Sequence, residues 1–423
     1  MALGRRRSPT FMHVTPPPFP GTAAPTPYDF VAPSSIAFGP GRVRELGTVA
    51  ARLGDVAWLV AGTRGLAGCG GEAGVGGLCA EAGLRLMRIA TVTGEPTVDD
   101  VVSALRGLPD RGGRSPVIVA IGGGAAIDLA KAIAALATNM NPSANPSATD
   151  LDQEVTDHLE GVGRGLSIRV APLPVVAVPT TAGTGAEATR NAVISCPRRR
   201  FKKSMRSPLM VPRAAIVDPV LTVACERKVT VASGLDCITQ LVESFVCRFG
   251  AALPRALVLD ALPRAIAALP RVLADPADID ARAAMSHAAL VSGLALTNSG
   301  LGMAHGVAAA LGIECGTPHG VACAVMLPVA VSVNRAACRD DFAALERAID
   351  HDASTSSDEA ADAFVMRIEA LCAASGAPRR LSEVGLDRGR LRWLAEHSGG
   401  ASMRGNPIEL GPEALLAIVD RAY

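Results

Sequence analysis

Short apolar runs alternate with helical stretches through the first half of the chain, from about residue 35 to about residue 215. Continuous apolar runs of this kind are typical of strands that are covered on both faces. They predict strands at Trp58 to Val60, near Leu86 to Ile89, at Val117 to Ile121 and at Val175 to Val178, and a helix over Gly76 to Ala82. Strands that alternate with helices favour a parallel α/β sheet. The segment from Asn139 to Gly165 is rich in Asn, Pro, Ser and Asp and is expected to be a surface loop.

The second half of the chain has a different pattern. After Asp218 and Pro219 the strand signals fade, and alanine- and leucine-rich sequence with helical periodicity follows. Prolines are expected to separate successive helices there, namely Pro254, Pro263, Pro270, Pro276, Pro318 and Pro328. We therefore predict an α/β domain over residues 31–215 and an all-helical domain over residues 216–423, after a disordered, proline-rich tail over residues 1–30. A ligand site is expected in the cleft between the two domains.

Composition and charge narrow the functional class. The 423 residues exceed one ordinary domain, and a hydrophobic content of 49% excludes wholesale disorder. The net charge of +1, from 41 basic and 40 acidic residues, gives no attraction toward nucleic acid or anionic lipid. No stretch approaches the roughly 18 apolar residues of a membrane helix. The ten cysteines include no CxxC pair, so we expect reduced thiols and a cytoplasmic location. The arginine run near the start is not followed by an apolar block, so we expect no secretory signal.

Two turns that follow buried strands suggest a nucleotide site. Gly122-Gly123-Gly124 follows the strand that ends at Ile121 and opens a helix. Glycines there let a phosphate approach the free amides of the helix start. This turn is not the GxGxxG fingerprint, and by itself it is equally consistent with a tight turn that binds nothing. Pro179 to Glu187 follows the strand that ends at Val178 and contains several threonine hydroxyls and glycine amides. Because carboxyl ends of parallel strands share one edge of a sheet, a nucleotide pyrophosphate is favoured over two empty turns.

Four residues of the helical half form a candidate metal site. Asp236 and Gln240 are spaced i and i+4, which places both side chains on one face of a helix. His305 and His319 lie in small or apolar sequence that is poor in other polar groups. A single histidine in such a setting is more often a hydrogen-bonded core residue, but a carboxylate with two imidazoles suits a divalent cation. The amide oxygen of Gln240 is a weaker donor than imidazole.

Taken together, these segments resemble the iron-containing (group III) alcohol dehydrogenase family, which has the dehydroquinate synthase-like fold. The resemblance runs from Ile36 to Tyr423 and rests on GGGAAIDLAKAIA, PTTAGTGAEATRNAVIS, AAIVDPVLT and LGMAHGVAAALG with the PHG that follows it. It implies an α/β nucleotide-binding domain with a parallel sheet, an all-α metal-binding domain, and a homodimer or larger assembly. The activity that it implies is metal-dependent, NAD(P)-linked interconversion of a small alcohol and an aldehyde or ketone.

The resemblance also implies roles for single residues. It places the pyrophosphate and the ribose–nicotinamide part of NAD or NADP against Gly123, Gly124, Ala125, Asp128, Thr180, Thr181, Thr189, Lys202 and Leu221. It places one divalent metal, Fe²⁺ before Zn²⁺, on Asp236, Gln240, His305 and His319.

The sequence departs from the family pattern at three positions. Gln240 stands where the family usually has a histidine ligand, and Ala309 stands where many members have a further histidine that is thought to help proton transfer. Gly62 replaces the acidic residue that commonly accepts the adenosine ribose hydroxyls. Losing that carboxylate removes repulsion against a 2′-phosphate, and Arg64 could pair with one, so NADP is expected to be tolerated.

Three other functions stay open at the level of sequence. A metal-independent reductase of the maleylacetate type would explain Gln240, although Asp236, His305 and His319 argue against it. A lyase of the dehydroquinate synthase type needs more lysine and arginine than these helical motifs display. A binding protein that kept the fold without catalysis would bind no nicotinamide nucleotide.

Overall fold

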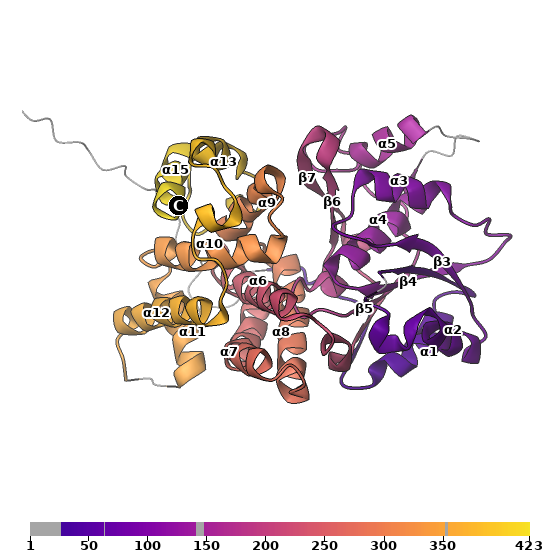
Figure 1. Cartoon of the computed structure of the whole chain (residues 1–423), viewed down its shortest axis with the longest axis horizontal. Helices are drawn as coiled ribbons and strands as arrows, with labels where there is room; N and C mark the ends of the chain where they lie inside the picture. The colour runs from indigo at the N-terminus through magenta and orange to yellow at the C-terminus, as the bar shows by residue number, and fades with distance from the viewer. Residues whose placement is uncertain (1–26, 63, 141–147, 352–353) are drawn as a thin grey trace, which may run out of the picture.

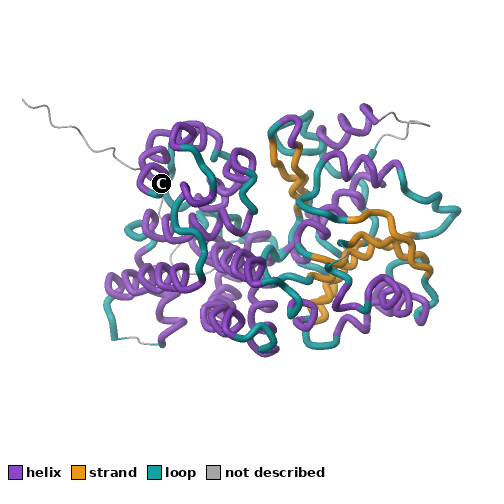
Figure 2. The backbone as a smooth tube through the Cα atoms, in the orientation of Figure 1, coloured by secondary structure: helices purple, strands orange, loops and turns teal. Residues whose placement is uncertain are grey.

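The computed structural model describes residues 27–62, 64–140, 148–351 and 354–423, which form two halves of different architecture (Figure 1). Every strand of the described chain lies in the N-terminal half, and helices build the C-terminal half (Figure 2). This arrangement confirms the predicted fold class. The predicted N-terminal tail lies outside the described residues except for residues 27–30, which belong to no helix or strand.

Six parallel strands form the central sheet of the first half. Their order across the sheet is β1-β8-β5-β4-β2-β3, and their bounds are β1 Ser35–Phe38, β8 Ala214–Val217, β5 Val175–Pro179, β4 Pro116–Gly122, β2 Val56–Ala61 and β3 Arg85–Thr91. The four strands predicted from apolar runs are β2, β3, β4 and β5. The edge strand β1 and its neighbour β8 complete the sheet. Strand β8 ends two residues beyond the expected domain boundary at residue 215.

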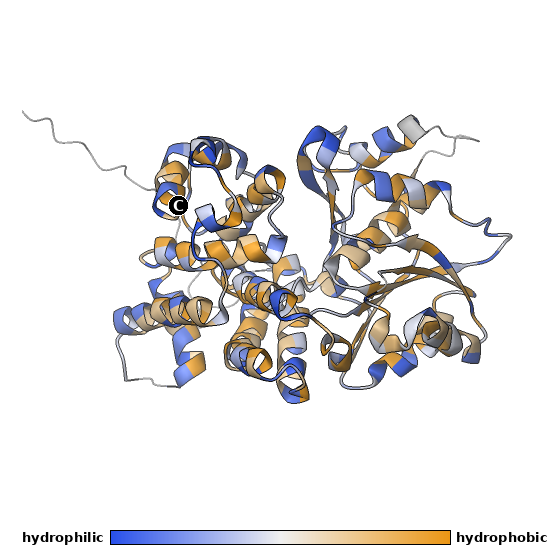
Figure 3. Cartoon of the chain, viewed as in Figure 1, coloured by the Kyte–Doolittle hydropathy of each residue, from blue (hydrophilic) through white to orange (hydrophobic). Residues whose placement is uncertain are grey.

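Helices cover both faces of this sheet. Successive side chains of a strand point to opposite faces, and in β2 Trp58 packs into one core while Leu59 packs into the other. One face is covered by α1 Leu46–Ala51 and α2 Gly71–Glu81, and the other by α3 Val98–Arg106, α4 Gly124–Asn139 and α5 Ala148–Asp157. The central strands β4 and β5 are buried at every position and are mostly orange in Figure 3. The predicted helix over Gly76 to Ala82 is confirmed as the second half of α2.

The expectation of a surface loop from Asn139 to Gly165 is wrong in its middle. Helix α5 occupies Ala148–Asp157, and its residues Leu151 and Val155 are buried in the core with α3 and α4. Asp150 and Gln153 are exposed on the opposite side of this helix, so its polar positions form the solvent face of an amphipathic helix.

A two-stranded antiparallel hairpin stands beside the sheet. It consists of β6 Asn191–Cys196 and β7 Phe201–Arg206. Ala192 and Ile194 are buried against α4, and Lys202 and Arg206 lie on the second strand of the hairpin. The hairpin faces the helical half (Figure 1), so it supplies polar side chains to the space between the two halves.

The second half is built around helix α6. Its helices are α6 Arg227–Val246, α7 Ala252–Ala274, α8 Ile279–Asn298, α9 Met303–Cys315, α10 His319–Asn334, α11 Arg339–Asp350, α12 Ser357–Ser375, α13 Leu391–His397, α14 Ala401–Arg404 and α15 Pro412–Arg421. Helix α6 is the one described helix that is long and apolar enough to cross a membrane, but 78% of that apolar stretch is buried inside the protein. This burial is typical of the central helix of a packed domain.

Four of the six prolines lie within helices instead of separating them. Pro254 is in the first turn of α7, where a proline is tolerated, and the other three are in helix interiors. Helix α7 continues through Pro263 and Pro270, and α10 continues through Pro328. A proline inside a helix costs about 3 kcal/mol because it removes one hydrogen bond and crowds the preceding turn. Both helices pack against α6 along much of their length, and the apolar burial there offsets that cost. Pro276 and Pro318 do lie between helices, as predicted.

Candidate functional site

The glycine turn and the threonine turn lie side by side at the carboxyl edge of the sheet. Strands β4 and β5 are paired up to Gly122 and Pro179, the residues from which the two turns begin. The turns touch, because a Cβ atom at Gly124 would lie 2.6 Å from Oγ1 of Thr184. No side chain fits at Gly124 without moving this loop. The two turns therefore form one surface at the start of helix α4, as the sequence predicted.

A buried lysine holds this surface together. Nζ of Lys131 donates to Oγ1 of Thr189 at 2.7 Å and to the carbonyl of Ala186 at 3.0 Å, and it lies 3.1 Å from Oδ1 of Asp128. The other carboxylate oxygen of Asp128 accepts from the backbone amide of Val193. Burial lowers the pKa of Lys131 and raises the pKa of Asp128, although each group opposes the shift of the other. This network fixes the threonine turn, helix α4 and the hairpin relative to one another.

Asp236 and His305 converge from two helices of the second half. Oδ1 of Asp236, on α6, lies 3.3 Å from Nε2 of His305, on α9. Both side chains are almost fully buried, and within the described residues neither of these two atoms has a hydrogen-bond partner. Leaving a buried polar atom unpaired costs about 1–3 kcal/mol. Two such atoms facing each other fit a site that a cation completes.

Glu243 sets the orientation of His305. Its Oε2 lies 2.6 Å from Nδ1 of His305, and its Oε1 accepts from the backbone amide of Ala304 at 2.6 Å. Oδ1 of Asn406 accepts from Met303, so two side chains from outside α9 satisfy amides at its first turn. Hydrogen bonding of Nδ1 to a carboxylate leaves Nε2 free to bind a metal. Burial opposes protonation of His305, but Cys323, Asp236 and Glu243 together raise its pKa well above the ordinary value, so a cation must displace a proton from Nε2 when it binds.

His319 brings a second imidazole to the same point. Its Nε2 lies 3.8 Å from Oδ1 of Asp236, and its ring centre lies 5.4 Å from that of His305. Burial lowers the pKa of His319 to about 4, so the ring is neutral, the state that a metal ligand requires. Cys323, one turn further along α10, completes a group of four residues whose donor atoms all lie within 4.8 Å of one another. Burial raises the pKa of the Cys323 thiol to about 12.

Gln240 lies next to this group, with both of its amide atoms engaged. Its Nε2 donates to Oδ2 of Asp236 at 3.1 Å, and its Oε1 accepts from the hydroxyl of Ser292 at 2.7 Å. The predicted pair on α6 is therefore on one helix face, but the amide oxygen of Gln240 points to Ser292.

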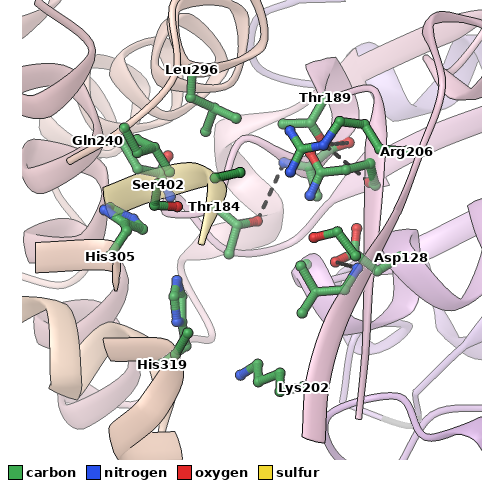
Figure 4. A pocket seen from close by; sticks show the side chains of 18 of the residues that line it. Asp128, Thr184, Thr189, Lys202, Arg206, Gln240, Leu296, His305, His319 and Ser402 are labelled. Atoms are coloured by element: carbon green, nitrogen blue, oxygen red, sulfur yellow. Dashed lines mark hydrogen bonds between the residues drawn. The ribbon is translucent and has the colours of Figure 1, made fainter. Parts of the chain in front are cut away.

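A cavity of about 270 Å³ joins the cation site to the nucleotide surface. Of the predicted residues, it is lined by Gly124, Ala125, Asp128, Thr189, Lys202, Gln240, His305 and His319. Figure 4 shows Gln240, His305 and His319 on its helical side and Asp128 and Thr189 across from them. The predicted residues thus come together from both halves of the chain.

The other predicted residues do not line this cavity. Gly123 is in contact range of Thr181, where its missing side chain lets the two turns approach. Thr180 is buried, with its backbone amide bonded to Gly122. Leu221 is buried against Gly68 in the core beneath the sheet. Asp236 is buried, and its Oδ1 lies within 4 Å of Nε2 of both histidines.

Several lining residues were not predicted. They include Arg206 and Ser204 of the hairpin, Leu296 of α8, Leu301 and Ser402. No spacing in the sequence marks them, because they come from separate elements. Cys323 and Glu243 could have been found: Cys323 follows His319 by four residues, and Glu243 follows Asp236 by seven, so each shares a helix face with a predicted ligand.

The loop after β2 lies at the same edge of the sheet. A Cβ atom at Gly62 would lie 2.9 Å from the carbonyl oxygen of Val92, so a side chain there would require a backbone shift. The guanidinium of Arg64 is exposed and lies 3.3 Å from a carboxylate oxygen of Glu226. An exposed pair of this kind is weak and leaves Arg64 available to other anions.

Comparison with known proteins identifies similar chains over nearly the whole length. A family model described as iron-containing alcohol dehydrogenase matches residues 33–219, and one described as the C-terminal part of the Fe-containing alcohol dehydrogenase family matches residues 230–423. Alcohol dehydrogenase 4 of Saccharomyces cerevisiae (strain YJM789) is 30% identical over 93% of this chain and 98% of its own. Lactaldehyde reductase of Escherichia coli (strain K12) is 30% identical over 91% of this chain and 97% of its own. The crystal structure of a 1,3-propanediol oxidoreductase is 27% identical and superposes with a TM-score of 0.84 over 94% of this chain and 100% of that one.

Proposed function

Because the chain belongs to the iron-containing alcohol dehydrogenase family, we propose that Asp236, His305 and His319 hold the divalent cation of an NAD(P)-linked alcohol dehydrogenase. The enzyme interconverts an alcohol with an aldehyde or ketone by hydride transfer. One observation carries the assignment of the metal site: Oδ1 of Asp236 and Nε2 of His305 are buried 3.3 Å apart, and neither has a hydrogen-bond partner among the described residues.

The residues around the cation site have separate roles in the proposed reaction. When bound, the divalent cation supplies a Lewis acid that polarises the substrate oxygen, and the nicotinamide donates or accepts the hydride. Glu243 fixes the ring of His305 through Nδ1, and Gln240 donates to Asp236 and holds its carboxylate in place. Donors held in advance need little reorganisation when charge develops in the transition state.

The opposite wall of the cavity suits the nucleotide. Gly124 and Ala125 begin helix α4 with free amides for the pyrophosphate, and Asp128, Thr189 and Lys202 line the path toward the cation site. Gly123 and Thr181 pack against each other beside this wall, Thr180 is bonded to Gly122, and Leu221 lies in the core beneath the sheet. The apolar side chains of Leu296 and Leu301 face the remaining space. A cavity of about 270 Å³ that must also admit the nicotinamide ring leaves room for a small aliphatic substrate.

The same site accepts NADPH as well as NADH. Gly62 presents no carboxylate at the position after β2, so a 2′-phosphate meets no repulsion there. Arg64 follows in the same loop, and its guanidinium forms a solvent-exposed ion pair with Glu226. A phosphate can compete with Glu226 for this guanidinium.

A spectrophotometric screen tests the proposed function. Small alcohols and aldehydes are offered to the metal-free protein with NADH or NADPH, with and without added Fe²⁺ or Zn²⁺. We expect oxidation or reduction of the nicotinamide only in the presence of cation. Turnover that is equally fast after exhaustive chelation would instead support a metal-independent reductase, and no binding of either nucleotide would support a binding protein.

Two further features support a homodimer and a cytoplasmic location. Strand β1 is an edge of the sheet, and its residue Ile36 is 40% exposed, which suits pairing with a second copy of the chain in a homodimer. All ten cysteines are free thiols, as expected in a reducing cytoplasm. Light scattering on the purified protein measures the mass, and Ile36→Lys should shift a dimer toward monomer.

A further inference from the structure

Cys323 meets the geometric conditions for a metal ligand. It lies one helical turn after His319 on α10, and its Sγ atom is 3.7 Å from Nε2 of His319. The side chain is fully buried, and it belongs to the group of four donors with Asp236 and His305. Zinc bonds of roughly 2.0–2.3 Å place tetrahedral donors about 3.3–3.8 Å apart. The separations of 3.3, 3.8 and 3.7 Å in this group lie in that range.

Gln240 is poorly placed for the same role. Its amide nitrogen, which cannot bind a cation, faces Asp236, and its oxygen accepts from Ser292. Reversing the amide would place its oxygen against the carboxylate of Asp236, where two acceptors repel each other. The present orientation therefore satisfies both amide atoms and leaves Oδ1 of Asp236 free to face the cation site.

We propose that Cys323 is the fourth protein ligand of the cation, in place of Gln240, and that Gln240 positions Asp236. The site then consists of one carboxylate, two imidazoles and one thiolate. Thiolate is a soft donor, and together with imidazole it favours Zn²⁺ over Fe²⁺. This inference rests on the proposed metal site, and it assigns a zinc preference to a chain of an iron-named family.

Cobalt(II) tests the inference because a cobalt–thiolate bond gives a charge-transfer absorption band in the near ultraviolet. The metal-free, full-length protein is titrated with Co²⁺, and binding is followed separately by equilibrium dialysis. We expect one ion per chain and the thiolate band in the wild type. Cys323→Ser should lose the band and bind Co²⁺ about tenfold or more weakly.

Two variants separate this outcome from general damage. Cys372→Ala removes a buried thiol from α12, outside the donor group, and should keep both the band and the affinity. Gln240→Ala should keep the band while affinity falls about tenfold, because Asp236 loses its positioning partner. Circular dichroism verifies that each variant is folded.

The outcomes distinguish the inference from the function on which it rests. Bound Co²⁺ without the band in the wild type, or a band that survives in Cys323→Ser, overturns the role of Cys323 but leaves the metal site standing. Absence of Co²⁺ binding overturns both. A competition between Zn²⁺ and Fe²⁺ for the metal-free protein, under anaerobic conditions, should favour Zn²⁺, and a preference for Fe²⁺ would contradict the proposed selectivity.

Discussion

Nδ1 of His305 lies 2.6 Å from Oε2 of Glu243, which is also hydrogen-bonded to the first turn of the helix that carries this histidine. The contact ties α6 to α9 and leaves Nε2 of His305 directed at Asp236. The carboxylate is buried, and the amides at the start of α9 offset its charge. One side chain thus caps a helix and orients a ligand of the proposed metal site.

The first prediction follows from this contact. In Glu243→Gln an amide N–H group can face Nδ1 of His305, which favours the tautomer with the proton on Nε2 and blocks metal binding. We expect metal affinity to fall about 10- to 100-fold. Competition with a chromophoric chelator measures it. Glu346→Gln is the matched control, because Glu346 is a buried glutamate that pairs with Arg367, outside the donor group. Equal affinities of Glu243→Gln and the wild type would remove the orienting role from Glu243.

The second prediction separates the metal from the nucleotide. His305→Ala should lower kcat by about a thousandfold, because the Lewis acid is worth several kcal/mol. NADH affinity, measured by fluorescence titration, should change less than about threefold, since the nucleotide wall comes mainly from the other domain. His287→Ala, at a half-buried histidine that pairs with Asp260 outside the donor group, serves as the control for both readouts. Equal loss of turnover and nucleotide affinity would count against this division of roles.

The third prediction concerns the cofactor. Arg64→Ala should raise KM for NADPH two- to fivefold and leave KM for NADH unchanged, because an exposed ion pair contributes about 0.5–1 kcal/mol. Steady-state kinetics with both cofactors measure the difference. Arg52→Ala is the control, since Arg52 is exposed and precedes β2, at the opposite edge of the sheet. A parallel rise for both cofactors would show that Arg64 does not recognise the 2′-phosphate.

The fourth prediction concerns pH. Burial raises the pKa of Glu187 from its ordinary value of 4.5 to about 7. Between these values the native state holds a proton that the unfolded chain has lost, so this residue's contribution to stability falls as pH rises through about 7. Glu187→Gln carries no such proton. The free energy of unfolding of the variant, relative to that of the wild type, should therefore rise by on the order of 3 kcal/mol between about pH 4 and about pH 8.

Urea unfolding at the two pH values measures this change. Glu81→Gln, at an exposed residue at the end of α2, is the control. Its free energy of unfolding should change with pH as that of the wild type does. If Glu187→Gln also follows the wild type at both pH values, the buried carboxyl is ionised throughout, and Lys131 offsets its burial.

The sequence by itself determined four strands of the sheet and the two turns, and it singled out three of the proposed metal donors. Continuous apolar runs gave β2, β4 and β5, because strands covered on both faces need no polar positions. The motifs gave the family, which the matches over residues 33–219 and 230–423 confirm. Asp236, His305 and His319 stood out as polar residues in apolar helices, a pattern that local sequence reveals without knowledge of packing.

Only the tertiary structure decided how these residues meet. The orientation of the Gln240 amide depends on Ser292, 52 residues away, and the ring of His305 depends on Glu243, 62 residues away. Helix α7 continues through two prolines because packing against α6 and α8 outweighs a local penalty. Propensity and spacing are properties of neighbours along the chain, whereas hydrogen-bond partners and burial are set by elements that only folding brings together.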